Sequence, residues 1–176
     1  MQMMSKLVIL LALACASLTL GACGGKAPKA AAMPIEIVLT QDAVAGGRSV
    51  FVDLVGVGAG EQGKYNGKAV RDWFAGKDND RLEGTKIGFV KSLTFKPGDS
   101  TTRVIKADDE MWNKILGRQA VSLFVFAFVG GEDTAGKDVS WRKELSMDPD
   151  RYDGEKIRLE VQRGGVYLVN LKPEKK

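Results

Sequence analysis

Beyond residue 33, apolar and polar side chains alternate along most of the chain, with the two-residue period of strands that bury one face. The stretch at 121–129 is instead apolar almost throughout, which predicts a central strand covered on both faces. Arg163-Gly164-Gly165 is a hairpin signal between two such runs. We therefore expect seven strands, at 34–40, 49–57, 86–95, 102–106, 121–129, 156–162 and 166–171.

Two short segments, 68–75 and 108–116, place their apolar residues at helical spacing, and a glycine follows each segment directly. Asp108 is the expected N-cap of the second helix. Each segment contains a tryptophan, Trp73 or Trp112. We interpret both tryptophans as core side chains, in preference to a platform that binds a ligand.

Seven strands, short turns and two small helices predict a mainly β fold, namely an antiparallel β-sandwich with two short helices. A parallel sheet built from βαβ units is disfavoured, because such units need a helix between most of the strands. We assign the sandwich domain to residues 34–176. A chain of this size buries roughly 70% of its unfolded surface, so the core can be stable without disulfides.

The amino-acid composition removes several kinds of chemistry. The 176 residues include no histidine and two cysteines, Cys15 and Cys23, both near the N-terminus. A Ser-His or Cys-His catalytic pair, a histidine-ligated metal, a disulfide scaffold and an all-cysteine zinc site are thereby excluded. The net charge of +4 is not concentrated in one segment, which argues against a nucleic-acid partner. We expect no catalytic residue, no metal site and no cofactor.

Two kinds of motif suggest ligands but lack essential parts. The segment 58–64 has the glycine spacing of a phosphate-binding loop, but Tyr65 replaces the required Ser or Thr, and the next two residues disfavour the helix that must follow. We interpret this segment as a loop. The acidic clusters at 78–83 and 148–155 lack EF-hand spacing and have basic neighbours, so we interpret them as solvated turns in preference to calcium sites.

The first 22 residues have a different character from the rest. Lys6 is their only charged residue, and an apolar run follows it as far as Leu20. This pattern is typical of a secretory signal peptide, and the run is shorter than the roughly 20 apolar residues of a comfortable membrane span. The run ends in Leu20-Gly21-Ala22-Cys23, which resembles the lipobox of bacterial lipoproteins.

The lipobox resemblance implies a membrane anchor. In lipoproteins of this kind, diacylglycerol is attached to the cysteine, here Cys23, the signal at 1–22 is removed, and the new amino group is acylated, palmitate being the fatty acid we expect. Two or three acyl chains hold a protein on a bilayer almost permanently. Gly24 follows the cysteine, which implies sorting to the outer membrane. Small residues and a proline in 23–33 predict a flexible tether.

Several segments, in order, resemble the outer-membrane lipoprotein of the type VI secretion system. They are a polar loop that ends in Gly47-Arg48, a Pro97-Gly98 turn, an apolar strand that contains Ala127, and a Trp141-Arg142 pair. The resemblance spans roughly residues 34–171 and implies a small, transthyretin-like β-sandwich with extra helices. Two departures are visible: the first loop lacks the Asn-Pro often found there, and the segment 56–84 is longer than expected.

What the resemblance implies is an adaptor rather than an enzyme. The family's domain faces the periplasm from the outer membrane and holds the periplasmic end of a large inner-membrane subunit. The loop after the first strand makes much of that contact. We carry this role over to the corresponding residues only, with an ordinary solvated hairpin loop as the alternative. These residues are Gln41, Asp42, Ala43, Val44, Ala45, Gly46, Gly47 and Arg48.

Two other classes of function stay open at this stage. One is a periplasmic ligand-binding or inhibitor lipoprotein without catalytic activity, which would need a concave aromatic face that includes Trp73, Phe74 or Trp112. The other is a hydrolase, which would need a cleft with converging carboxyl groups of raised pKa. Paired carboxylates can meet from distant parts of a chain, so the sequence does not test for them.

Overall fold

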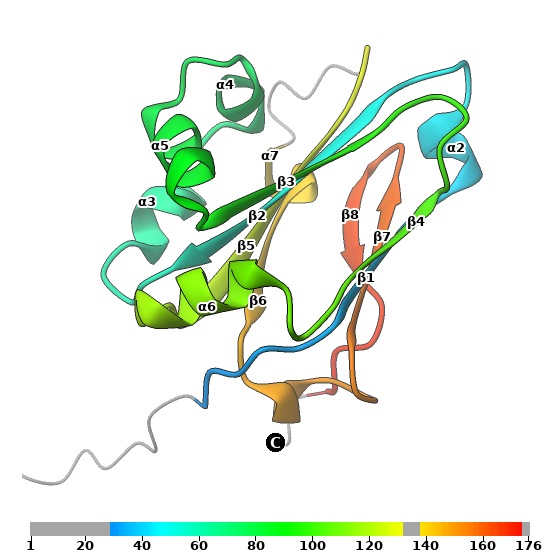
Figure 1. The fold of residues 1–176 in the computed structure, drawn as a ribbon. Coiled ribbons are helices and arrows are strands. Elements are labelled where there is room, and N and C mark those ends of the chain that lie inside the picture. The colour runs from blue at the N-terminus through cyan, green and yellow to red at the C-terminus, as the bar shows by residue number, and fades with distance from the viewer. Residues whose placement is uncertain (1–28, 132–137, 174–176) are drawn as a thin grey trace, which may run out of the picture.

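The computed structural model describes residues 29–131 and 138–173. The strands of this part of the chain are β1 (Ile35–Leu39), β2 (Val50–Val57), β3 (Val90–Phe95), β4 (Thr102–Ile105), β5 (Ser122–Val129), β6 (Arg142–Ser146), β7 (Ile157–Gln162) and β8 (Gly165–Leu168). They form two four-stranded sheets, in the orders β4-β1-β7-β8 and β3-β2-β5-β6 (Figure 1). β1 and β7 are parallel, and the other neighbours are antiparallel. The predicted mainly β sandwich is confirmed.

Helices connect the strands and cover part of their surface. They are α2 (Gln41–Val44), α3 (Gln62–Asn66), α4 (Val70–Phe74), α5 (Asn79–Ile87), α6 (Glu110–Gly117), α7 (Asp138–Trp141) and the 3-10 helix η1 (Pro149–Arg151). The two helices expected from the sequence correspond to α4 and α6. The other helices of the described residues were not expected, and neither was strand β6.

Two local predictions are wrong because of these additional helices. The strand expected from residue 86 begins only at Val90, since α5 occupies the preceding residues and ends at Gly88, whose φ of +86° is left-handed. The segment 58–64 is not a simple loop, because its last residues begin α3. α3 buries Tyr65, the residue that stands in place of the Ser or Thr of a phosphate-binding loop.

The two sheets differ in how they are covered. α3, α4 and α5 lie against the outer face of the β3-β2-β5-β6 sheet (Figure 1). The Trp73 ring stacks on Phe126 with centroids 4.4 Å apart, and the Tyr65 ring lies 5.8 Å from that of Phe124. Both faces of β2 and β5 are consequently buried. β1 and β7 of the other sheet instead alternate between buried and more accessible residues, as their sequence period predicts.

α6 closes one end of the interior between the two sheets. Its Ile115 is fully buried and packs against Gly56 of β2, where a Cβ atom would come within 2.4 Å of the Ile115 side chain. The helix is capped by Asp109 and not by the expected Asp108: the Asp109 carboxylate accepts a hydrogen bond of 3.0 Å from the Met111 amide.

The start of the described residues and the β1–β2 connection lie at opposite ends of the sandwich. β1 runs from the end where the described residues begin toward α2 (Figure 1). The amide of Ala31 donates a hydrogen bond of 3.0 Å to the Met147 carbonyl, which fastens the start of this segment near the end of β6. Among the described helices, none combines the length and the apolar character needed to cross a bilayer.

Candidate functional site

The predicted partner-binding segment, 41–48, connects β1 to β2 and contains the single helical turn α2. Ala43 is buried beneath this turn, while Gln41, Asp42 and Ala45 are exposed. Gly46 and Gly47 then have φ values of +74° and +67°, which only glycine adopts readily, so the chain can reverse direction within two residues. The segment is an ordered turn whose backbone is set by its sequence, not an extended hairpin loop.

A long-range contact fixes this turn on the β4-β1-β7-β8 sheet. The Asp42 carboxylate accepts hydrogen bonds from the Thr40 hydroxyl and, at 3.1 Å, from the Arg163 amide in the β7–β8 hairpin. These two donors, the hydroxyl first and the amide second, hold the pKa of Asp42 below its ordinary value of 3.8. The carboxylate is therefore an anion at neutral pH, and it links two connections that are 121 residues apart in the sequence.

The β3–β4 turn lies beside the β1–β2 connection and encloses a hollow with it. The hollow has a volume of about 200 Å³, and its apolar walls come from Leu39, Val44 and Phe95 together with the turn at 96–101. The turn is closed by the Asp99 carboxylate, which accepts a 3.0 Å hydrogen bond from the Lys96 amide. Gly47 and Pro97, which belong to two separate motifs of the sequence resemblance, thus line the same hollow.

A second group of polar residues lies under the helices of the covered sheet. Asp53 of β2 is 1% exposed, and its Oδ2 accepts hydrogen bonds from Trp73 Nε1 at 2.9 Å and from Arg81 Nε at 2.5 Å. The carboxylate thereby joins β2 to α4 and α5 at once. Because both donors point at one buried oxygen atom, the arrangement is a structural anchor and leaves no open position for a ligand on that oxygen.

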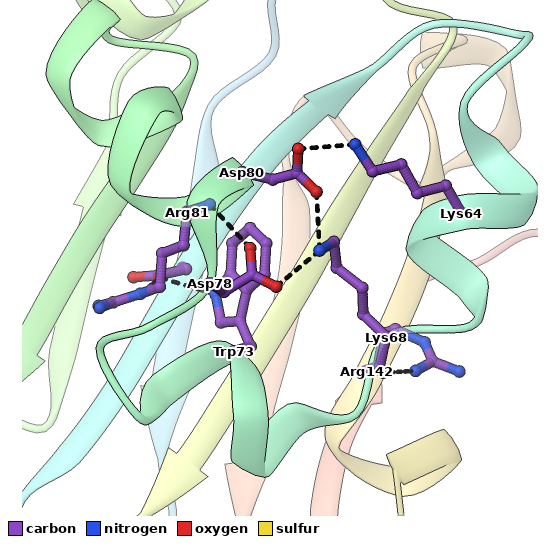
Figure 2. A network of polar contacts seen from close by, with 8 residues as sticks. Lys64, Lys68, Trp73, Asp78, Asp80, Arg81 and Arg142 are labelled. Carbon is purple, nitrogen blue, oxygen red and sulfur yellow. Dashed lines mark hydrogen bonds and ion pairs between the residues drawn. The ribbon is translucent and has the colours of Figure 1, made fainter.

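Figure 2 shows Lys64 and Lys68 pointing toward the acidic residues at the start of α5. Lys68 Nζ lies 2.6 Å from Asp78 Oδ2 and 2.7 Å from Asp80 Oδ2, and Lys64 Nζ lies 2.6 Å from Asp80 Oδ1. Asp78 also caps α5, through a 3.0 Å hydrogen bond from the Arg81 amide. The prediction of a solvated turn is wrong for this cluster, because Asp78 and Asp80 form ion pairs with lysines and Asp78 caps a helix.

The electrostatics of this network favour the charged forms. Burial disfavours the charge of Lys68, but its hydrogen bonds to Asp78 and Asp80 outweigh burial and raise its pKa. Burial likewise opposes ionisation of Asp80, and the hydrogen bonds from Lys64 and Lys68 lower its pKa nonetheless. Both partners therefore keep their charges at neutral pH, and the ion pairs join α3 and the α3–α4 connection to α5.

The second acidic cluster, 148–155, is also used locally. The Asp148 carboxylate caps η1 by accepting a 3.0 Å hydrogen bond from the Asp150 amide, and the Asp153 carbonyl accepts one of 2.6 Å from the Asn170 side chain. Across residues 29–131 and 138–173, we find no group of three or more Asp, Glu, His or Cys residues placed to hold a metal ion.

Ser122 and Glu144 border a shallow hollow of about 480 Å³ at the end of the sandwich opposite α2. Gln62 Nε2 donates to Ser122 Oγ at 2.6 Å and to Glu144 Oε1 at 2.7 Å, and the Ser122 hydroxyl donates to the same Glu144 oxygen at 2.7 Å. Asn66 donates to the other Glu144 oxygen at 3.2 Å. In these bonds the polar groups of the four side chains serve as partners for one another, and the bonds join α3 to β5 and β6.

Of the three aromatic residues named for the ligand-binding class, two lie in the core and Phe74 is partly buried against it. Trp73 and Trp112 are 0% and 2% exposed, which confirms the interpretation as core residues and removes them from any concave ligand-binding face. For the hydrolase, the carboxyl groups of the described residues with a shifted pKa all shift downward, because hydrogen bonds from lysine or hydroxyl donors outweigh burial. These groups belong to Glu36, Asp42, Asp80 and Asp109.

The expected lipidation site, Cys23, lies outside the described residues. The structure brings the segment 41–48 together with two regions that were not assigned to the site from the sequence. One is the Pro97-Gly98 turn, which was recognised only as a motif. The other is the β7–β8 hairpin, whose contact through Arg163 has no local signal because it depends on how the strands assemble.

No protein-family model matches the sequence, and no curated protein matches it. Similar solved structures include the type VI secretion system (T6SS) protein TssM C-terminal domain (869–1107) from EAEC, with a TM-score of 0.50, 15% identity, and coverage of 78% of this chain and 99% of that one. The T6SS lipoprotein TssJ1 from Pseudomonas aeruginosa has a TM-score of 0.45 and 17% identity over 83% and 99% of the two chains.

Lip from Serratia marcescens, a membrane-bound component of the same type of secretion system, has a TM-score of 0.45 and 13% identity, and the match covers 78% of this chain and 97% of Lip. At these identities, the likeness to the TssM domain shows a common fold and nothing further, and the two lipoprotein matches are weaker still.

Proposed function

We propose that this chain is a lipid-anchored adaptor of the outer membrane, facing the periplasm, that docks an inner-membrane T6SS subunit through the β1–β2 connection. The observation that carries the proposal is the position of that connection relative to the start of the domain. The described residues begin at one end of the sandwich, and the segment 41–48 lies at the other (Figure 1). A tether at the first end would present the second end away from the membrane.

The structure of the connection supports this role. Two glycines with positive φ and the Asp42 contact to the β7–β8 hairpin define the shape of the turn, so little conformational entropy would be lost on binding. Gln41, Asp42 and Ala45 are exposed on it. Anchoring also raises the effective concentration of a module near its partner, so a small interface of this kind can be sufficient between two membranes.

The first experiment tests the anchor. We expect Cys23→Ser to release the protein from the membrane fraction or to leave its signal uncleaved, because the substituted side chain has no thiol to receive the lipid. Cys15→Ser is the matched control, since Cys15 would leave with the signal, and it should change neither fractionation nor processing. Unaltered membrane fractionation and processing of the Cys23→Ser protein would contradict the proposal.

The second experiment tests the partner. The full chain with a C-terminal affinity tag is isolated from cross-linked cells, and its companions are identified by mass spectrometry. We expect an inner-membrane T6SS subunit to be enriched, and we expect Ala45→Asp in the exposed part of the connection to reduce that enrichment at least tenfold. Asn113→Asp on α6, at the opposite end of the sandwich, is the control. Absence of every T6SS subunit would refute the assignment of the partner.

A further inference from the structure

The acidic residues at the α2 end are turned toward the backbone of their own connections. Asp42 accepts a hydrogen bond of 3.1 Å from the Arg163 amide, and Asp99 accepts one of 3.0 Å from the Lys96 amide. In both cases the carboxylate is neutralised in part by N–H dipoles and serves to fix a turn. These two negative charges are therefore committed to the fold of this end of the sandwich.

Among the described residues of the three connections at this end, basic side chains outnumber acidic ones by one. Arg48, Lys96 and Arg163 lie in the same connections as Asp42 and Asp99, and Arg103 on β4 and Glu160 on β7 follow with opposite charges. The Arg103 guanidinium lies 5.7 Å from the centre of the Phe95 ring and 3.4 Å from Asp99. Within the described part of the chain, the exposed ammonium group of Lys96 makes no ion pair.

Lys96 lines the apolar hollow between α2 and the β3–β4 turn, and Arg103 lies beside Phe95, which lines the same hollow. Its walls include Leu39, Val44, Phe95 and Pro97, and its volume of about 200 Å³ suits one large apolar side chain. Its shape is set in advance, because Gly47 and Gly98 have φ values of +67° and +86° and the Asp99 contact closes the turn. A preformed apolar pocket with charged residues at its rim is the usual construction of an anchoring site in a protein interface.

The geometry points to an acidic partner segment that inserts one large apolar side chain into this hollow, with its flanking carboxylates beside Lys96 and Arg103. This inference rests on the proposed function for the location of the docking surface, and it adds the chemistry of what docks there. The apolar side chain supplies the affinity, and the rim charges increase the rate of association and select against basic segments.

The test uses the full chain in cells, with the photoreactive amino acid benzoylphenylalanine in place of the exposed Ala45, which follows Val44 of the hollow, and in place of Asn113 on α6 as the control. The cross-linked peptide of the partner is sequenced by mass spectrometry. We expect an excess of Asp and Glu around a large apolar residue. A neutral or basic peptide, or a yield no greater than that from position 113, would overturn the inference.

Charge reversal provides the second arm. Lys96→Glu should lower the cross-linking yield from position 45 about tenfold, whereas Lys114→Glu, an exposed lysine on α6, should change it less than twofold. An unchanged or higher yield with Lys96→Glu would overturn the inference. An acidic peptide from a protein outside the T6SS would support the inference and refute the proposed function, so the two can fail separately.

Discussion

Asp53 beneath the helices and Asp42 at the α2 end are both carboxylates that accept two hydrogen bonds, but their surroundings differ. Asp53 is buried and depends on Trp73 and Arg81 for its partners. Asp42 is exposed and accepts hydrogen bonds from the Thr40 hydroxyl and from the Arg163 backbone amide. Water can replace a lost partner only at the exposed site, so the covered sheet face must keep its polar partners to remain folded.

This difference separates stability from binding within one small domain. The face covered by α3, α4 and α5 combines stacked aromatic rings with ion pairs that are shielded from water. At the α2 end, the segment 41–48 has a defined backbone, and Ala43 is its one buried residue. Substitutions at the α2 end are therefore expected to have small effects on folding, which is the condition that lets a surface adapt to a partner.

Asp53→Ala should give the largest loss of stability. It removes the common acceptor of Trp73 and Arg81 and leaves a partly buried cation unpaired, for which about 3 kcal/mol is expected from comparable ion pairs. Urea unfolding measures the loss. Asp42→Ala is the control and should cost clearly less than Asp53→Ala, since it breaks contacts that water replaces. Equal losses in the two variants would contradict the comparison.

Gly84→Ala should have the next largest effect. A Cβ at this position of α5 would come within 2.4 Å of Val90 Cγ2 and 2.9 Å of the Phe89 ring, both on buried residues. Such overpacking costs about 2 kcal/mol, more than the roughly 1 kcal/mol that alanine gains over glycine in a helix. In Gly63→Ala of α3, nothing lies within 4 Å of the new atom. A gain in stability is therefore expected there, and a loss of similar size at both positions would refute the close packing of α5.

The same two regions show which parts of the fold the sequence could predict. Seven strands were expected because their residues alternate or are apolar throughout, whereas β6 was missed because Leu145 is its one buried apolar residue. α5 was missed for a related reason: Gly84 is its only buried residue, so it has no apolar stripe, and ion pairs to Lys64 and Lys68 hold it in place. Those contacts form between segments and leave no periodic signal.

The candidate site was predictable to a similar extent. The segment 41–48 could be selected by resemblance, and its two glycines already indicated a tight turn. The hollow could not be predicted, because its second wall comes from the β3–β4 turn, about 50 residues later in the sequence, and the two meet only when the sheets pack. The same is true of the Arg163 amide that fixes Asp42.

The pH dependence of stability should reflect the ion pairs of α5. The pKa of Asp80 is lowered from 3.8 in the folded state, because its hydrogen bonds to Lys64 and Lys68 outweigh burial. The stabilisation is therefore present above pH 4 and is lost as the pH falls through the lower, folded-state pKa. Asp80→Asn should lower the free energy of unfolding by about 1 kcal/mol at pH 7 and flatten its decline below pH 4. Urea unfolding at several pH values measures both effects.

Glu83→Gln, on the exposed side of the same helix, is the control for that experiment. It should leave both the stability at pH 7 and the acid dependence nearly unchanged, because no ion pair of Glu83 is found among the described residues. If Asp80→Asn kept the full acid dependence of the unsubstituted protein, the ion pairs of α5 would not be its source.

Lys96→Ala should have the smallest effect on stability, within about 0.5 kcal/mol. The Lys96 side chain is exposed and forms no ion pair among the described residues, so its removal breaks few stabilising contacts. Its backbone amide, which donates to Asp99, is kept in the variant, so the β3–β4 turn should stay closed. Thermal unfolding measures the change. A loss above 1 kcal/mol would mean that the rim of the hollow helps to hold the sandwich together. Binding and stability would then depend on the same side chains, and the contrast with the Asp53 region would no longer hold.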